Sequence, residues 1–178
     1  MANIFLIADT HFGHKGVCEF LNNDGNKLRP FNDVNEMDEV LVKNWNLVVN
    51  SKDKIYVLGD VVINRKSLKT LSRLNGEKVL IKGNHDIFRI NEYLEYFKDV
   101  RGTHKLDSYI LSHIPIHPDS IARWASGNIH GHLHSNNVKK IDEYKQEVID
   151  DRYICVSVEQ INYTPIAYEE LKKLHNKD

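Results

Sequence analysis

Short apolar runs that end in possible metal ligands are the feature that most restricts how this chain folds. Three such runs lie in the first half of the sequence. They are residues 4–8 before Asp9, residues 55–58 before Asp60, and residues 79–82 before Asn84 and His85. Runs of this length that are rich in aliphatic and β-branched residues are typical of buried strands. We therefore expect buried strands with polar side chains just beyond their carboxyl ends.

Helical patterns separate these strands. The strongest covers residues 33–48, where apolar side chains fall on one face and Asp33 and Glu36 have the spacing of a capping box. Residues 67–74 and 90–97 show shorter helical patterns. The resulting order β-α-β-α-β favours an α/β fold in which helices cover the sheet.

The second half of the chain has more strands and fewer helices. Residues 109–111, 128–130 and 153–158 are strand candidates, and this succession favours some antiparallel pairing within a layered sandwich. The charged stretch 139–151 has few apolar residues, so we expect a solvated hairpin or loop there. Residues 164–174 could form a helix, or their first residues could complete a strand.

Composition bounds the size and surroundings of the protein. With 178 residues, of which 41% are hydrophobic, we expect one domain covering residues 1–178. The net charge of −1 gives no global field that would recruit nucleic acid or an anionic membrane, so such a partner would be bound locally. The short apolar start and the two cysteines give neither a signal peptide nor a disulfide framework, which favours a cytoplasmic location.

Five separated segments carry side chains that suit divalent transition metals. The candidate ligands are Asp9, His11, Asp60, Asn84, His113, His132 and His134. Imidazole and carboxylate together suit manganese, iron, zinc or nickel, whereas a closed structural zinc site would favour thiolates. Ligands beyond neighbouring strands of an open α/β sheet converge on one crevice, so the set indicates a catalytic metal site.

The order of these segments resembles the calcineurin-like metallophosphoesterase family, whose pattern is D-x-H, GD, GNH-D/E, a lone His and GH-x-H. The resemblance runs from Asp9 to His134, and the sequence around it is similar to that of small bacterial and phage members. It implies an α/β fold, a layered α-β-β-α sandwich of two mixed sheets flanked by helices. It also implies a metal-dependent phosphoesterase that hydrolyses a phosphate ester.

The resemblance implies a role for each ligand. One metal ion would be held by Asp9, His11 and His134, and the other by Asn84, His113 and His132, with Asp60 bridging the two. Manganese is the first expectation for both divalent ions, with nickel, zinc, iron or magnesium as alternatives. Water shared by the two ions would be the nucleophile.

Four further residues are candidates for work on the substrate. By resemblance, His85 would be the general acid that protonates the leaving group, and Asp86 would orient or charge it. His14 could contact substrate, orient a ligand or lie in a loop. The guanidinium of Arg29 could bind a phosphate oxygen, although Arg29-Pro30 could equally form a structural turn.

The sequence leaves the substrate open. We expect a small phosphodiester or a nucleotide, because a chain of this size has no room for a large capping domain and carries no basic stripe. The first alternative is a nuclease acting on short or single-stranded nucleic acid. A non-catalytic metal-binding scaffold is a further alternative, although the complete ligand set together with His85 favours catalysis. No membrane partner is expected, and the pattern does not indicate an oligomeric state.

Overall fold

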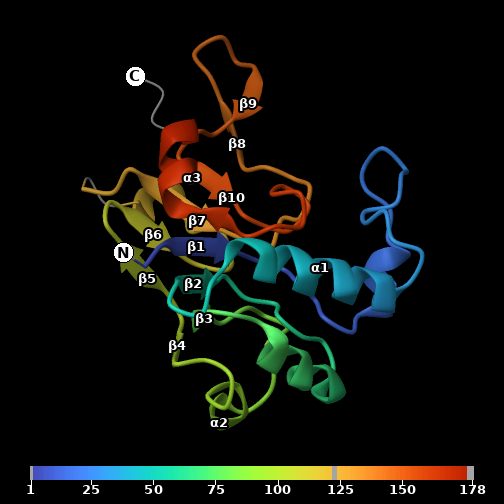
Figure 1. The fold of residues 1–178 in the computed structure, drawn as a ribbon. Coiled ribbons are helices and arrows are strands. Elements are labelled where there is room, and N and C mark those ends of the chain that lie inside the picture. The colour runs from blue at the N-terminus through green and yellow to red at the C-terminus, as the bar shows by residue number, and fades with distance from the viewer. Residues whose placement is uncertain (1, 122–123, 176–178) are drawn as a thin grey trace.

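A five-stranded sheet forms the centre of the computed structural model, which describes residues 2–121 and 124–175 (Figure 1). Its strands lie in the order β11-β1-β2-β3-β4. Their bounds are Ile4–Ile7 for β1, Lys54–Val57 for β2, Glu77–Ile81 for β3, Asp99–Arg101 for β4 and Ile166–Ala167 for β11. Strands β1 to β4 are parallel, and β11 runs antiparallel to β1. The carboxyl ends of the four parallel strands therefore lie at the same edge.

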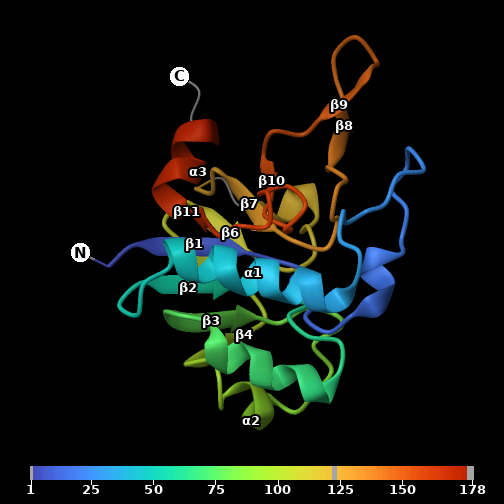
Figure 2. The same cartoon turned by 45° about the vertical axis from the view of Figure 1, so that its right-hand side comes forward.

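Helices cover one face of this sheet, as the view in Figure 2 shows. The α-helix α1 spans Val34–Val48 and connects β1 to β2, as predicted. Its N-terminus is capped by Asp33, whose side chain accepts hydrogen bonds from two backbone N–H groups. The connection from β2 to β3 is a 3-10 helix, η2, at Arg65–Arg73, and α2 is limited to Ile90–Tyr93. The prediction of a helix through residue 97 was therefore too long.

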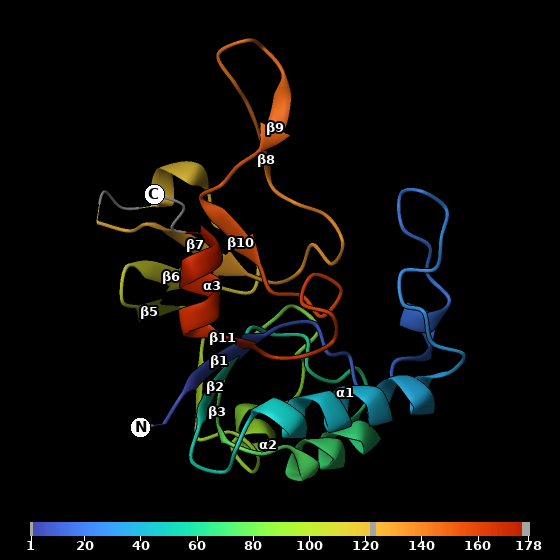
Figure 3. The same cartoon turned by 45° about the horizontal axis from the view of Figure 1, so that its top comes forward.

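A second, four-stranded sheet lies on the other face of the first. Its order is β10-β7-β6-β5, with β10, β7 and β6 parallel and β5 antiparallel to β6. The strands span Tyr153–Cys155 (β10), Gly127–His130 (β7), Tyr109–Leu111 (β6) and His104–Leu106 (β5). Figure 3 shows α1 and α2 on one side of β1, β2 and β3, and α3 (Tyr168–His175) and β10 on the other. The predicted layered fold of two mixed sheets is confirmed.

Alternation along the strands of the first sheet supplies both cores. In β1, Phe5 and Ile7 face α1 and η2, whereas Leu6 and the following Ala8 face the second sheet. Successive side chains of a strand point to opposite faces, so a strand that is apolar throughout fits between two layers. This explains why residues 4–8, 55–58 and 79–81 have no charged side chain at any position.

The remaining segments lie at the periphery. Strands β8 (Lys139–Ile141) and β9 (Glu147–Ile149) form an exposed hairpin that projects from the body, as the charged sequence predicted (Figure 1). Two short 3-10 helices, η1 at Lys15–Cys18 and η3 at Pro118–Ser120, lie in connections. Both alternatives for residues 164–174 occur in turn, because β11 is followed at once by α3. None of the helices in the described part of the chain has the length and apolarity needed to span a bilayer.

Candidate metal centre

The predicted ligands lie directly beyond the carboxyl ends of five parallel strands. They are Asp9 and His11 after β1, Asp60 after β2, Asn84 after β3, His113 after β6, and His132 and His134 after β7. Neighbouring parallel strands place such side chains next to one another, so residues far apart in sequence meet at one edge of the sandwich. All seven predicted ligands come together in this way.

Six of them form two groups of three, and within each group the ligand atoms lie within 4.8 Å of one another. The groups are Asp9, His11 and His134, and Asp60, His113 and His132. The seventh, Asn84, adjoins the second group, because its Oδ1 lies 2.9 Å from Nε2 of His113. Both groups offer imidazole nitrogens and carboxylate oxygens, a donor set that suits divalent transition metals.

One carboxylate oxygen connects the two groups. Oδ2 of Asp60 lies 3.7 Å from Nε2 of His11 in the first group and 3.4 Å from Nε2 of His113 in its own group. The other oxygen, Oδ1, accepts the backbone N–H of His85 at 2.9 Å, which fixes the orientation of the carboxylate. Asp60 therefore faces both groups at once.

The backbone of the ligand residues is strained. The left-handed region, with positive φ, contains Asp9 (59°), His11 (50°), Asp60 (54°), His132 (69°) and His134 (52°). This conformation costs roughly 1–2 kcal/mol for a residue with a Cβ atom. Such strain concentrates at functional sites, where the surrounding structure maintains it. Its repetition at five ligands indicates a backbone shaped for positioning these side chains.

Two glycines allow the chain to pass close to the ligands. A Cβ atom at Gly131 would lie 2.5 Å from Oδ2 of Asp9, and one at Gly83 would overlap Oδ1 of Asp60. Any other residue at these positions would displace a carboxylate. These two glycines therefore leave room for ligand side chains.

Several buried polar atoms have no hydrogen-bond partner in the described structure. They include Oδ1 of Asp9 and both ring nitrogens of His11. Burial raises the pKa of Asp9 to about 6, and burial together with the charge of Arg29 lowers the pKa of His11 to about 3. Unpartnered buried polar groups are costly, and a divalent cation would satisfy a carboxylate and a neutral imidazole together. The residues present therefore fit divalent metal ions.

Hydrogen bonds from the surrounding protein orient the ligand side chains. Nδ1 of His113 donates to the carbonyl oxygen of Leu58 at 2.8 Å. Oδ2 of Asp9 accepts from Oγ of Ser157 at 2.7 Å and from the backbone N–H of His132 at 2.9 Å. Such contacts to the non-coordinating atoms of metal ligands fix their orientation.

Glu159 is a site residue that the sequence reasoning missed. Its side chain is 4% exposed, and Oε1 lies 3.0 Å from Nδ1 of His134. Like the ligands, it directly follows an apolar run, residues 153–158, and this signal could have identified it. The strand in that run is shorter than predicted, because β10 ends at Cys155.

Arg29 lies behind the ligands and is fully buried, with 0% exposure. Its Nε donates to Glu159 at 2.7 Å, and its two terminal nitrogens donate to the carbonyl oxygens of Thr10 (3.0 Å) and Asp9 (2.6 Å). These contacts engage all three guanidinium nitrogens with the protein. The geometry favours the structural alternative for Arg29 over a phosphate contact.

Asp86 also holds backbone rather than the side chain of His85. Its buried carboxylate accepts the backbone N–H groups of Asp60 (2.8 Å), Val61 (3.0 Å) and Gly83 (2.8 Å). It therefore ties the loop after β2, which carries Asp60, to the loop after β3, which carries Asn84. We infer a positioning role for Asp86.

His14 and His85 flank the first group. The ring centroid of His11 lies 5.5 Å from that of His14 and 5.8 Å from that of His85. The side chain of His85 is exposed, whereas His14 is partly buried and its Nδ1 has no hydrogen-bond partner. Both imidazoles lie close enough to the ligands for a bound substrate to reach them.

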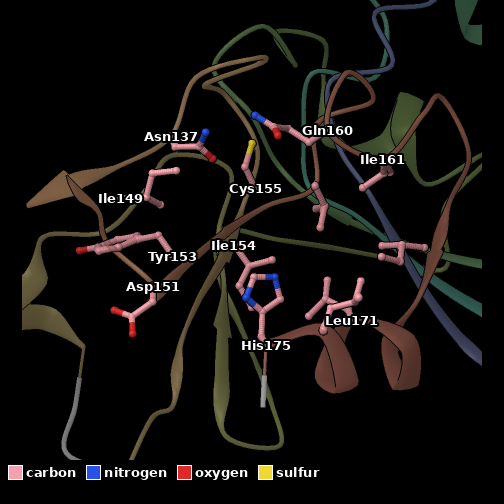
Figure 4. A pocket seen from close by; sticks show the side chains of 13 residues that line it. Asn137, Ile149, Asp151, Tyr153, Ile154, Cys155, Gln160, Ile161, Leu171 and His175 are labelled. Carbon is pink, nitrogen blue, oxygen red and sulfur yellow. The ribbon is translucent and has the colours of Figure 1, made fainter. Parts of the chain in front are cut away.

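A cavity of about 390 Å³ lies behind the loop of His134, between β10 and α3 (Figure 4). It is lined mainly by aliphatic side chains, and the seven candidate ligands are not part of its lining. Cys155 and Gln160 lie at one end of it, and Nε2 of Gln160 donates to the carbonyl oxygen of His134 at 3.1 Å. Gln160 therefore connects the wall of this cavity to the loop that carries His134, but the cavity itself is separate from the candidate metal centre.

The two-sheet fold and the paired ligand groups define a metal-binding α/β protein whose donor set is suited to hydrolytic chemistry. Residues 2–169 match the calcineurin-like phosphoesterase family, and the chain belongs to this family. It is accordingly a metal-dependent phosphoesterase, and the expected family is confirmed.

Individual relatives cover the chain to different extents. It is 38% identical over 187 residues to an uncharacterised protein of Methanocaldococcus jannaschii, covering 99% of this chain and 93% of that protein. It is 35% identical over 91 residues to the gene 66 protein of Mycobacterium phage L5, covering 48% of this chain and 41% of that protein. The crystal structure of a protein of unknown function from Aquifex aeolicus has a TM-score of 0.70 and 26% identity, covering 98% and 100% of the two chains.

Proposed function

We propose that this protein is a phosphodiesterase with a dinuclear metal centre, acting on a small phosphodiester or a nucleotide. The observation that carries this proposal is the position of Asp60, whose Oδ2 lies within 4 Å of a histidine nitrogen in each ligand group. A carboxylate that faces two groups of ligands is suited to bridge two ions. Manganese is the first candidate because histidine and carboxylate ligands suit it, with nickel, zinc, iron or magnesium as alternatives.

The ligands would be divided between the two ions by the groups in which they lie. Asp9, His11 and His134 would hold one ion, and Asn84, His113 and His132 the other, with Asp60 shared. When bound, such a pair of ions supplies an activated water as nucleophile and neutralises charge on the phosphate. The protein contributes the fixed geometry of the ligands, which Ser157, Asp86 and the strained backbone maintain.

His85 would supply the proton for the leaving oxygen. Its backbone N–H donates to Asp60, and its ring lies beside His11 at the exposed side of the centre. An exposed imidazole next to the ligands is free to approach the leaving group of a bound ester. His14, on the other side of His11, is our candidate for a contact to the phosphate.

The proposal is tested by assaying metal-stripped protein after manganese, nickel, zinc or magnesium has been restored in turn. The substrates are bis-p-nitrophenyl phosphate, p-nitrophenyl phosphate and a single-stranded oligonucleotide, and His132→Ala serves as the ligand-deficient control. We expect metal-dependent cleavage of the diester that the control variant lacks. Cleavage of the monoester alone would contradict the phosphodiesterase assignment, and no cleavage with any metal would contradict catalysis by this centre. Salt-sensitive cleavage of the oligonucleotide alone would favour a nuclease.

A further inference from the structure

A cavity of about 360 Å³ opens directly beside the second ligand group. Asn84 and His113 form part of its wall, and the remainder includes Lys82, Thr103, Ile114 and Ile116. A phosphate bound at the second group would therefore have one of its substituents next to this cavity. The cavity is distinct from the one between β10 and α3.

The wall that carries the two isoleucines is held in place by hydrogen bonds. Oγ of Ser112 donates to the carbonyl oxygen of Ile114 at 2.7 Å. Oδ1 of Asn128 accepts the backbone N–H of Ile116 at 3.1 Å, and the hydroxyl of Tyr153 donates to the Ile116 carbonyl at 2.8 Å. Asn128 is fully buried and lies in β7, so the segment is attached to the second sheet. The two isoleucines are therefore presented on a fixed backbone.

This fixed segment exposes apolar surface. The side chain of Ile114 is 51% exposed, and that of Ile116 is partly buried. Ligand sites combine an apolar wall with a few fixed polar groups, and a preorganised wall lowers the entropy lost on binding. Lys82, Asn84, Ser112 and His113 supply the polar groups here. The volume lies within the roughly 300–1,000 Å³ range of small-molecule pockets, so the cavity has room for a ring-sized group.

We propose that the pocket formed by Thr103, Ile114 and Ile116 binds one flat, apolar ester group of the substrate, such as an aromatic ring. This inference rests on the proposed function, because it assumes that the phosphate lies at the second ligand group. It makes Ile114 and Ile116 specificity-determining residues. The proposal also implies that the substrate is not a phosphate ester that carries small alkyl groups only.

The test compares two phosphonates that cannot be hydrolysed at phosphorus. Phenylphosphonate and methylphosphonate are titrated into the zinc-loaded full-length protein, with isoleucine δ1 methyl groups observed by NMR. We expect phenylphosphonate to bind about tenfold more tightly, since a well-buried apolar group changes affinity by factors of about 10–200. Its ring current should shift the methyl signals of Ile114 and Ile116, whereas the exposed Ile141 on the β8–β9 hairpin should be unaffected.

Matched variants separate the pocket from general effects on the protein. Ile114→Ala should weaken phenylphosphonate binding by about three- to tenfold and leave methylphosphonate binding unchanged, because it removes only side-chain atoms that contact the phenyl ring. Ile141→Ala removes an isoleucine that is also exposed, at 67%, and should change neither affinity. Equal affinities of the native protein for the two phosphonates, failure of both to bind, or an equal effect of Ile114→Ala on both would overturn the proposal.

Ester hydrolysis gives an independent test of the proposed function. A phenyl preference in binding without hydrolysis of any ester would overturn the catalytic proposal and leave the pocket assignment standing. Hydrolysis without a phenyl preference would overturn the pocket assignment alone.

Discussion

Oε1 of Glu159 lies 3.0 Å from Nδ1 of His134, and the same oxygen lies 2.7 Å from Nε of Arg29. A carboxylate that accepts the Nδ1 proton of an imidazole leaves Nε2 as the nitrogen with a lone pair for a metal ion. Because Arg29 donates to the same oxygen and holds it in place, Glu159 fixes both the orientation and the tautomer of His134. The contact therefore connects a buried ion pair to the metal centre.

Replacing Glu159 by leucine should weaken metal binding at the first ligand group by about 10–100-fold, the usual effect of losing such a contact. Glu159→Gln keeps an acceptor oxygen for Nδ1, so it should retain most of the affinity. Both variants leave the charge of Arg29 uncompensated, so their stabilities should fall together. The measurements are calorimetric metal titration and the NMR tautomer of the His134 imidazole in the metal-free protein.

Asp150→Asn provides the control for losing a buried carboxylate. Asp150 is 2% exposed and is paired with Arg152. The Asp150→Asn variant should be less stable than the native protein but should keep the native metal affinity. Metal affinities of Glu159→Leu and Glu159→Gln that both equal the native affinity would show that Glu159 acts on stability alone.

Arg29→Ala should destabilise the metal-free protein strongly, by about 3–5 kcal/mol, because it removes the guanidinium that compensates the charge of the buried Glu159. It also removes donors from the carbonyl oxygens of Asp9 and Thr10. The measurement is chemical denaturation of the metal-free protein. If Arg29→Ala keeps the native stability and only raises KM, Arg29 has the substrate-binding role considered from the sequence.

The sequence identified the seven candidate ligands because each follows a strand-like run, and parallel strands bring their carboxyl ends together. Arg29 lacked such a signal. The same residue types serve phosphate binding and buried ion pairing, and only the contacts to Asp9, Thr10 and Glu159 distinguish the two. For Asp86, the backbone contacts could not be predicted either, because proximity to His85 in sequence does not show which groups its carboxylate accepts.

Short elements were the least predictable parts of the fold. Strands β4 and β5 have three residues each and were not predicted, because Asp99–Arg101 and His104–Leu106 contain charged residues at an edge of a sheet. Such strands depend on pairing with β3 and β6 rather than on their own apolar pattern. The 3-10 geometry of η2 likewise depends on its packing, since its helical pattern alone does not distinguish the two kinds of helix.

Asp60→Asn should weaken both metal sites together. An amide offers one oxygen where the carboxylate offers two, so bridging and the hydrogen bond from His85 cannot both be kept as they are. We expect at least about tenfold weaker binding of each ion and a corresponding loss of diester hydrolysis. Metal content after dialysis is the measurement, with Asp53→Asn, a buried carboxylate that caps a turn, as control. Retention of two tightly bound ions with full activity would rule out the bridging role.

His85→Ala should leave metal content unchanged and lower turnover by about 10²–10⁴-fold for esters with poor leaving groups. Esters with good leaving groups need little proton transfer, so the loss should be much smaller for p-nitrophenyl esters. His117→Ala removes another exposed imidazole, paired with Asp119, and should have no effect. The measurement is kcat across a series of leaving-group pKa values, and an equal loss across the series would contradict the acid role.

Metal affinity should fall as the pH is lowered through about 6. Burial raises the pKa of Asp9 to about 6 in the metal-free protein, so its carboxyl binds a proton below that pH, and the proton must leave before an ion binds. From Asp9 alone, affinity at about pH 5 should be about tenfold lower than at about pH 7. His11 adds nothing to this pH dependence, because burial and Arg29 lower its pKa to about 3 and it stays neutral between about pH 5 and about pH 7. Burial alone would lower the pKa of His134, but Glu159 and Asp9 raise it overall, so protonation of His134 also weakens metal binding as the pH falls.

Manganese titrations in two buffers of different ionisation enthalpy measure the protons released on metal binding, and Asp9→Asn should release fewer of them at about pH 5. Affinity that is constant across this range, without proton release, would contradict the raised pKa of Asp9.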